Sequence, residues 1–489
     1  MTLERANQFL QLKDYYSAEQ EYKKLLRVKT SNIEAIWGLG RVALAKNDYK
    51  RAYDLFVRCL HLNANVCKVY LSLAEACSAL TQFDKTEAAL LSAYKIQPNS
   101  SHVLYALSVY YCEKGYFDKS EAYANTLLNI DKYKIKAFSI LVRMKKLTIA
   151  LNSSEVFKPY FELLKSNSVS TTDKVLLNYS FADLYHHHKE YSLAFTFYEA
   201  ANRLQRGLIE FSVEAMLPSI ELLIGCFDIS FVQKFSSISP SAINLTSQIN
   251  ITPIFIVGQP RSGSTLLEQM LIGHNEIVSA GELPHIGDDV VQGVIQMTKD
   301  EFPLGCKSLN QEQCLTLALH YLNNLKDISG GQHRYVIDKM PANFQFIGLI
   351  KLILPHAKII HIERDPKDVS WSIYRNGFDA LEPHFCSQSE IAQYHHIYKN
   401  VMYHWGEVLP HDICNIQYEE LVDEPEKELT KVLSFCCLDF DKACLNFSDK
   451  NRVIKTLSDT QLRHGIQKRE VADWLPYKDE LKSMFELLK

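Results

Sequence analysis

Apolar and polar positions in the first two hundred residues alternate with the period of amphipathic helices, and this pattern itself repeats every 34 residues. Each repeat carries an aromatic residue, a small residue three positions later and a large residue eight positions beyond that. The aromatic residues are Tyr15, Tyr49, Phe83 and Phe117, the small ones Ala18, Ala52, Thr86 and Ser120, and the large ones Leu26, Leu60, Tyr94 and Leu128. Small residues let two antiparallel helices approach closely, and large ones fill the seam with the next pair. The sequence therefore predicts an α-solenoid of paired helices.

These repeats resemble tetratricopeptide repeats, including Pro98 at the repeat-ending position. Four repeats are clear, and a further unit from Phe181 to Tyr198 restores the pattern after a shift of six residues. We expect five or six helix pairs in a repeat array over residues 1–205, followed by a capping helix and linker over residues 206–250. Arrays of this family bind partners on a concave face or pack against a neighbouring domain, and the pattern leaves both open. We interpret the three histidines from His186 as a polar loop between paired helices.

From Thr252 onward, short β-branched apolar runs each lead into polar residues. Such runs are typical of buried parallel strands, and the clearest are residues 253–257, 358–363 and the run that begins at Tyr335. We expect a three-layer α/β domain with a mostly parallel sheet over residues 251–489, so the chain is predicted to be multidomain, α and α/β. Polar residues at the carboxyl edge of such a sheet are well placed to bind a ligand.

A glycine-bearing loop follows the first of these strands. Residues 258–265 match the pattern G-x-x-x-x-G-K-[ST], except that Ser264 occupies the lysine position. Backbone N–H groups of such a loop and of the helix behind it converge on an anion. A nucleoside triphosphatase needs the missing lysine on its phosphates, whereas the cation here is Arg261, inside the loop. A degraded triphosphatase loop and a loop for a less charged group are both compatible with this segment.

The segment from Pro260 to Thr265 is similar to the phosphosulfate-binding loop of sulfotransferases, and it is closest to the form found in protein-tyrosine and tetratricopeptide-repeat sulfotransferases. These enzymes use 3′-phosphoadenylyl sulfate as donor and need no metal. The resemblance implies a phosphate-loop-like fold in which the loop holds the donor through Arg261, Ser262, Gly263, Ser264 and Thr265.

A second motif agrees with the first. Residues 364–372 follow another predicted strand, and Asp365 is placed to cap a helix that has Pro366 at its first position. In the sulfotransferase family an arginine and a serine eight residues apart hold the 3′-phosphate of the donor, and Arg364 and Ser372 match both.

The resemblance also assigns roles in the transfer step. It implies that Glu282, 21 residues beyond Arg261, is the base for the acceptor hydroxyl, with His285 and His274 as competing bases. Arg261, Lys339 and Ser458 would stabilise the transferred group. Tyr418 matches a residue near the adenine, although core packing is an alternative for it. The sequence departs from the protein-tyrosine sulfotransferases at Asp473, where that family has a basic residue.

Composition excludes several other classes of protein. Of the 489 residues, 47% are hydrophobic and 22% charged, which excludes a disordered or low-complexity chain. A formal net charge of −4 gives no reason to expect nucleic-acid binding. The twelve cysteines lack CxxC spacing, so we expect buried thiols rather than disulfides or a zinc site. Neither a signal-peptide pattern nor an apolar run of about 18 residues is evident, so we expect a cytoplasmic protein without a membrane span.

The sequence thus predicts transfer of a sulfuryl group from 3′-phosphoadenylyl sulfate to a hydroxyl of a protein, such as a tyrosine, or of a carbohydrate. No metal is expected, and the repeats would recruit a protein partner or the substrate. Two alternatives remain at this point. One is a kinase-like phosphotransferase with the same loop, and the other is a non-catalytic adaptor whose nucleotide-binding domain is vestigial.

Overall fold

The computed structural model describes residues 3–46, 48–80, 82–144, 154–241, 249–377, 382–446 and 472–489. Its contacts divide the chain into two compact units, Met1–Asn152 and Ser153–Lys489. The domain boundaries expected from the sequence, 1–205, 206–250 and 251–489, stay a prediction. The contact boundary differs from them because the later helices pack with the α/β part of the chain.

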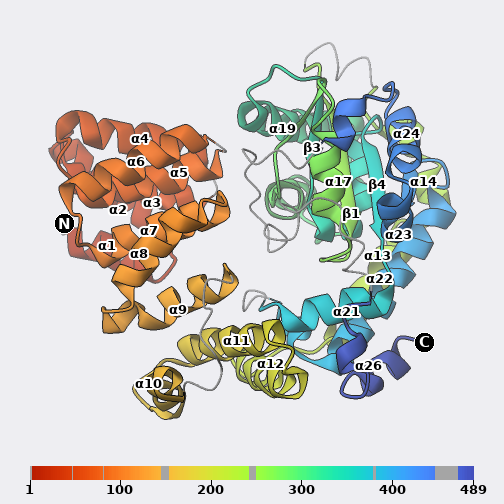
Figure 1. Ribbon diagram of the computed structural model, residues 1–489. Coiled ribbons are helices and arrows are strands. Elements are labelled where there is room, and N and C mark those ends of the chain that lie inside the picture. The colour runs from red at the N-terminus through yellow and green to blue at the C-terminus, as the bar shows by residue number, and fades with distance from the viewer. Residues whose placement is uncertain are drawn as a thin grey trace. The chain divides into compact units, whose positions relative to one another are not determined.

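The first unit consists of antiparallel helix pairs, as the repeat pattern predicts. The small residues of the pattern are buried, so neighbouring helices approach closely. Charged residues one period apart link successive pairs, since Lys68 contacts Glu34 at 2.6 Å and Arg41 contacts Glu75 at 2.5 Å. The helices are α1 (Leu3–Gln11), α2 (Tyr15–Val28), α3 (Ile33–Ala45), α4 (Tyr49–Leu62), α5 (Cys67–Ala79), α6 (Phe83–Ile96), α7 (Ser101–Glu113), α8 (Phe117–Leu127) and α9 (Lys134–Arg143) (Figure 1).

The second unit begins with α10 (Ser154–Lys165), which packs on α11 (Thr171–His187). From α11 onward the helices pack on the α/β part; the later ones are α12 (Tyr191–Arg206), α13 (Leu217–Cys226), α14 (Ile229–Val232) and α15 (Phe235–Ile238). The ring of Tyr198 on α12 lies 5.6 Å from that of Trp371, and Asn202 donates a hydrogen bond of 2.9 Å to the backbone oxygen of Tyr374. The last helix pair of the repeat pattern is therefore part of the core that supports the second predicted motif.

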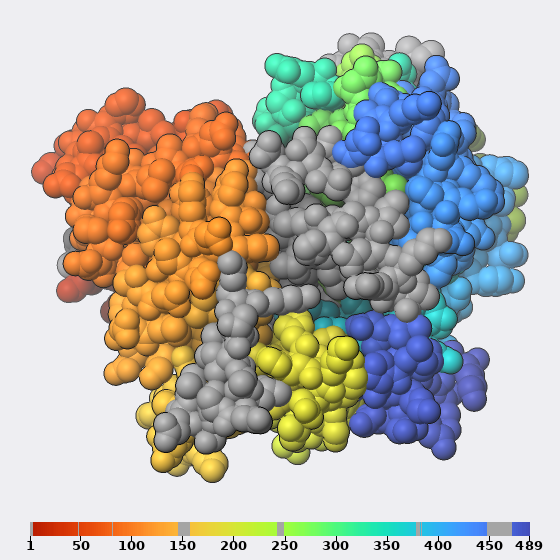
Figure 2. Space-filling model, in the orientation of Figure 1, coloured from red at the N-terminus to blue at the C-terminus, as the bar shows by residue number. Residues whose placement is uncertain are grey.

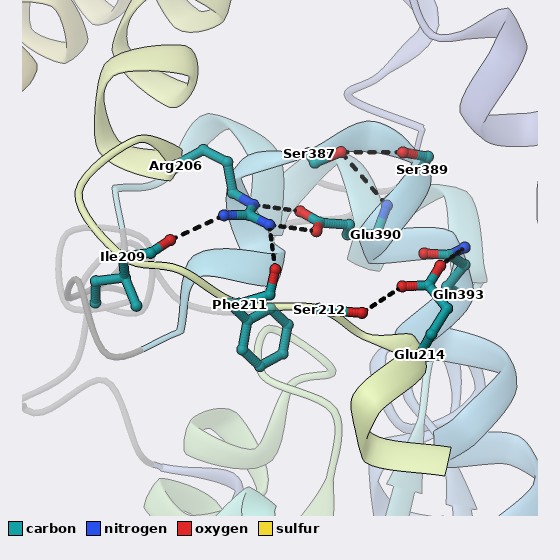
Figure 3. A network of polar contacts seen from close by, with 9 residues as sticks. All are labelled: Arg206, Ile209, Phe211, Ser212, Glu214, Ser387, Ser389, Glu390 and Gln393. Atoms are coloured by element: carbon teal, nitrogen blue, oxygen red, sulfur yellow. Dashed lines mark hydrogen bonds and ion pairs between the residues drawn. The ribbon is translucent and has the colours of Figure 1, made fainter.

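The segment predicted as a linker is packed in its described part. Phe231 and Phe235 are buried against the helices of the α/β unit. At its start, Arg206 binds both carboxylate oxygens of Glu390, at 2.7 and 2.8 Å, and the backbone oxygens of Ile209 and Phe211 (Figure 3). This network fixes the turn after α12 on α22 (Gln388–Val408).

The sheet has five parallel strands in the order β2-β3-β1-β4-β5. They are β1 (Thr252–Gly258), β2 (Ile277–Ser279), β3 (Tyr335–Asp338), β4 (Lys358–Glu363) and β5 (Ile413–Gln417). Alternate residues face opposite sides, so Ile254 and Ile256 join one core while Phe255 and Val257 join the other. The predicted fold, an α-helical repeat region followed by an α/β domain with a parallel sheet, is confirmed.

Helices cover both faces of this sheet. One face packs against α17 (Ser264–Leu271), α23 (Tyr418–Asp423) and α24 (Pro425–Phe435) (Figure 1). The other packs against α19 (Gln311–Ser329), α20 (Ile347–Ile353) and α22. The other α-helices in the described part of the chain are α18 (Val291–Thr298), α21 (Pro366–Arg375) and α26 (Lys482–Leu487).

The C-terminal residues lie beside the end of the repeat pattern. His186 lies in the last turn of α11, and its Nδ1 forms a hydrogen bond of 2.7 Å with the hydroxyl of Tyr477. The prediction of a polar loop is wrong for His186, because this residue is still helical and its side chain bonds to a residue 291 positions away. Figure 2 shows the same proximity, with α11 and α12 in yellow next to the dark blue C-terminal residues.

Candidate functional site

The predicted phosphate loop joins β1 to α17, and both of its glycines are required by close packing. A Cβ on Gly258 would lie 2.5 Å from the backbone oxygen of Ile362 on β4. A Cβ on Gly263, whose φ is 99°, would lie 2.2 Å from the ring of Tyr418. Ser264 and Thr265 are the first two residues of α17, so the N-terminus of this helix adjoins the loop. The local structure is that of an anion-binding turn.

Arg261 joins the two predicted motifs. Its φ of 69° is in the left-handed region, which side chains other than glycine seldom adopt and which concentrates at functional sites. From this position its Nε donates a hydrogen bond of 2.9 Å to Oγ of Ser372, which is 111 residues away in the chain. The structure therefore brings the loop and the second motif together.

Arg364 and Tyr418 complete this side of the site. The guanidinium of Arg364 lies 4.4 Å from the ring centre of Tyr418, and its Nη1 donates to the backbone oxygen of Arg261 at 3.4 Å. Asp365 caps α21 by accepting from the backbone N–H groups of Lys367 and Asp368. Two cations thus meet next to the loop.

The residues present fit a phosphate-bearing ligand. Ser262 is 1% exposed, and its Oγ has no hydrogen-bond partner among the described residues. A buried hydroxyl without a partner is costly, and a ligand oxygen would satisfy it. Ser262 and Arg364 also line a cavity of about 430 Å³ at the carboxyl ends of the strands. Hydroxyls, backbone N–H groups and arginines are the donors that phosphate groups require.

Glu282 and Lys339 form an ion pair at the ends of the neighbouring strands β2 and β3. Lys339 is 1% exposed, whereas the side chain of Glu282 is 48% exposed. Gly281, with a φ of 80°, makes the turn before Glu282, and its backbone oxygen accepts from the backbone N–H of Lys339 at 2.9 Å. A solvent-accessible carboxylate and a buried ammonium group are thus held together near β1, the strand that leads into the phosphate loop.

Sequence reasoning missed two residues behind this pair. Glu268, on α17, is 5% exposed and accepts a hydrogen bond from the hydroxyl of Ser279, and its other oxygen lies 4.0 Å from Nζ of Lys339. Burial raises the pKa of Glu268. The sequence did contain a sign of this residue, because Glu268 is a charged residue within the apolar run that follows the loop. Charged side chains are rarely buried in such a run unless they are paired.

The two competing bases have other partners. Nδ1 of His285 lies 2.6 Å from a carboxylate oxygen of Asp289, and Nδ1 of His274 accepts from the backbone N–H of Glu276 at 3.1 Å. Both histidines are buried. Asp338, the residue before Lys339, is also buried and accepts a hydrogen bond of 2.8 Å from Tyr321, and burial raises its pKa to about 7.

Asp473 pairs with Arg375 at the C-terminal end of α21. Two turns earlier, Asp368 accepts from the backbone N–H of Ala472 at 2.8 and 3.1 Å. The last residues of the chain are therefore anchored on the helix that carries Ser372. Ser458, predicted as a catalytic residue, lies outside the described residues.

Among the described residues, no cluster of three or more histidine, cysteine, aspartate or glutamate side chains could hold a metal ion. The twelve cysteines are free thiols. All but Cys437 are buried, which agrees with the expectation of buried thiols. In the described part of the chain, no single helix has the length and apolar character of a membrane span. One bent pair of segments, Glu214–Cys226 and Ile229–Ile238, has that length and apolar character only when the two segments are taken together.

Residues 253–442 match the model of a sulfotransferase family. An uncharacterized protein of Aquifex aeolicus is 28% identical over 335 residues, which cover 67% of this chain and 43% of that protein. Protein-tyrosine sulfotransferase 1 of Danio rerio is 25% identical over 204 residues, which cover 40% of this chain and 56% of the relative. This chain therefore spans about half the length of these curated relatives.

Solved structures give weaker similarities. The sulfotransferase domain of the Synechococcus PCC 7002 olefin synthase aligns with 49% of this chain and 96% of its own, at 22% identity and a TM-score of 0.34. YrrB, a TPR protein, aligns with 39% of this chain and 87% of its own, at 18% identity and a TM-score of 0.27. The resemblance expected from the motifs is confirmed by the family match: the C-terminal region carries a sulfotransferase-family domain.

Proposed function

We propose that the α/β domain transfers a sulfuryl group from 3′-phosphoadenylyl sulfate to a hydroxyl acceptor. The observation that carries this proposal is the hydrogen bond from Arg261 to Ser372, because it unites two anion-binding motifs at one edge of the sheet. A donor with phosphate groups at both ends of a ribose needs two such neighbouring motifs. The match of residues 253–442 to a sulfotransferase family supports the same assignment.

In this proposal the site has a donor half and a transfer half. The donor half holds the nucleotide through Arg261, Ser262, Gly263, Ser264, Thr265, Arg364, Ser372 and Tyr418. When bound, the donor would supply the sulfuryl group, and adenosine 3′,5′-bisphosphate would be the leaving group. The transfer half contains Glu282, which takes the proton of the acceptor hydroxyl, and Lys339, which with Arg261 and Ser458 stabilises charge on the transferred group.

The pairing of Glu282 with Lys339 gives these roles a physical basis. The ion pair holds the carboxylate of Glu282 next to the cation that would contact the transferred group. Glu282 is partly exposed, so an acceptor can approach it. Lys339 is buried and follows β3, the strand next to β1. We expect the pair to separate during transfer, with Glu282 turning to the acceptor and Lys339 to the leaving oxygen.

For the acceptor we propose a protein hydroxyl, such as a tyrosine, or a carbohydrate, brought to the site with help from the repeat array. One relative is a protein-tyrosine sulfotransferase, which favours the first choice. We propose that the reaction takes place in the cytoplasm and requires no metal.

The test uses ³⁵S-labelled donor with purified protein and host lysate. The Glu282→Ala variant should label the lysate about 10²-fold less than the wild type, the usual scale for loss of a general base. Glu276→Ala is the matched control, because Glu276 is an exposed glutamate six residues earlier. Equal labelling by the wild type and Glu282→Ala would remove Glu282 from the mechanism.

Calorimetry with adenosine 3′,5′-bisphosphate tests the donor half separately. Binding without label transfer to any acceptor would favour the adaptor alternative, and magnesium-dependent turnover of ATP would favour a phosphotransferase. If intact protein gave no heat with the bisphosphate, the proposal would be abandoned.

A further inference from the structure

Glu268 is a buried carboxylate for which the proposed reaction has no role. It lies on α17, the helix that follows the phosphate loop, between residues that pack in the apolar core. A carboxylate in such a place is costly unless it is paired and hydrogen-bonded. Its neighbours are therefore informative.

The two oxygens of Glu268 contact both components of the transfer half. One oxygen accepts from the hydroxyl of Ser279, and that hydroxyl in turn accepts from the backbone N–H of Gly281 at 2.9 Å. The other oxygen lies 4.0 Å from Nζ of Lys339. Glu268 is thus linked to the turn that presents Glu282 and to the ammonium group that Glu282 binds.

The charges of this cluster explain why a second carboxylate is useful. Glu268, Lys339 and Glu282 together carry one negative charge when all three are ionised. If Glu282 takes a proton from the acceptor, Lys339 loses its exposed partner at the moment when its positive charge is needed. A buried ammonium group without a carboxylate nearby is costly and has no partner to hold it in position. Glu268 is excluded from solvent and remains as its partner.

We infer that Glu268 is a positioning residue, which keeps Lys339 oriented during transfer and fixes the Ser279–Glu282 turn. This inference rests on the proposed function of the site. In this inference α17 contributes to both halves of the site, because its N-terminus adjoins the phosphate loop and Glu268 contacts the transfer half.

The experiment separates the charge of Glu268 from its hydrogen bond. Glu268→Gln removes the charge and keeps an acceptor for Ser279, while Ser279→Ala removes the hydroxyl and keeps the charge. Glu428→Gln is the matched control, because Glu428 is an equally buried carboxylate whose lysine partner, Lys431, lies on α24. Each variant is assayed for the initial rate of ³⁵S transfer to host lysate at saturating donor, and for the donor concentration that gives half of that rate.

We expect Glu268→Gln to lower the saturated rate by about 10²-fold, the scale of a misplaced catalytic group, with less than about a threefold change in half-saturating donor. In a Lys339→Ala background the same substitution should change the rate by less than about twofold, because the lysine through which it acts is absent. Glu428→Gln should match the wild type. An equal loss from Glu268→Gln in both backgrounds, or no loss in either, would overturn the inference.

A second readout does not depend on activity. Hydrogen exchange at the amide of Gly281 should be faster in Ser279→Ala and in Glu268→Ala than in Glu268→Gln, which keeps the bond to Ser279. Bisphosphate binding by the wild type reports separately on the proposed function. Unchanged exchange in all three variants would disprove the positioning of the turn, whether or not the protein transfers sulfate.

Discussion

The donor half and the transfer half of the site are built from different kinds of contact. The donor half presents hydrogen-bond donors: two arginines, hydroxyl groups and the N–H groups of a loop and a helix end. The transfer half is a closed charge network in which Lys339 lies between Glu282 and Glu268. The donor half therefore suits a ligand that carries hydrogen-bond acceptors, whereas the transfer half must exchange partners to react. Substitutions should affect binding in the first half and rate in the second.

The largest effect is expected for Lys339→Ala. It removes a cation from the reacting group and leaves Glu268 buried without its lysine, so we expect the rate of label transfer to fall by about 10³-fold. Breaking a buried pair typically costs about 3 kcal/mol of unfolding free energy, which urea denaturation would detect. If the rate fell while bisphosphate affinity fell by the same factor, the division into two halves would be wrong.

A smaller effect, confined to binding, is expected for Ser372→Ala. This change removes the partner of Arg261 and one of the hydroxyls proposed to hold the donor. A hydrogen bond to a charged group contributes about 1.5 kcal/mol or more, so bisphosphate affinity should fall by about tenfold. Calorimetry measures the affinity, and the saturated transfer rate should stay close to that of the wild type. A lower saturated rate with unchanged affinity would place Ser372 in the transfer half.

The same contrast explains how much of the site could be predicted from the sequence. Apart from Tyr418, the residues of the donor half lie in two short segments, each with a strand, a turn and a helix start that local patterns reveal. The charge network joins α17, the end of β2 and the end of β3. No local pattern states that β2 and β3 are neighbours, so the pairing of Glu282 with Lys339 and the role of Glu268 needed the sheet order.

The fold follows the same rule. The helix pairs and the strands from Thr252, Tyr335 and Lys358 were predictable, because their periodicity is local. The packing of Phe235 and the hydrogen bond of His186 were not, because their partners come from other parts of the sequence. Composition suggested a linker and a loop at these places, and long-range apolar and polar contacts gave them fixed positions instead.

The smallest effect concerns Asp338, the residue that ends β3 directly before Lys339. We expect it to appear only as a dependence of stability on pH. Burial raises the pKa of Asp338 to about 7, so between the usual pKa of an aspartate and pH 7 the folded state holds a proton that the unfolded state has released. The stability that this proton contributes is present in acid and is lost as the pH rises through about 7. Asp338→Asn keeps a neutral side chain beside Tyr321 at every pH. The melting temperature of this variant should therefore rise relative to that of the wild type as the pH increases from 5 to 8. Parallel melting curves over this range would mean that Asp338 is ionised in the folded protein, and the network around Lys339 would then contain a third carboxylate.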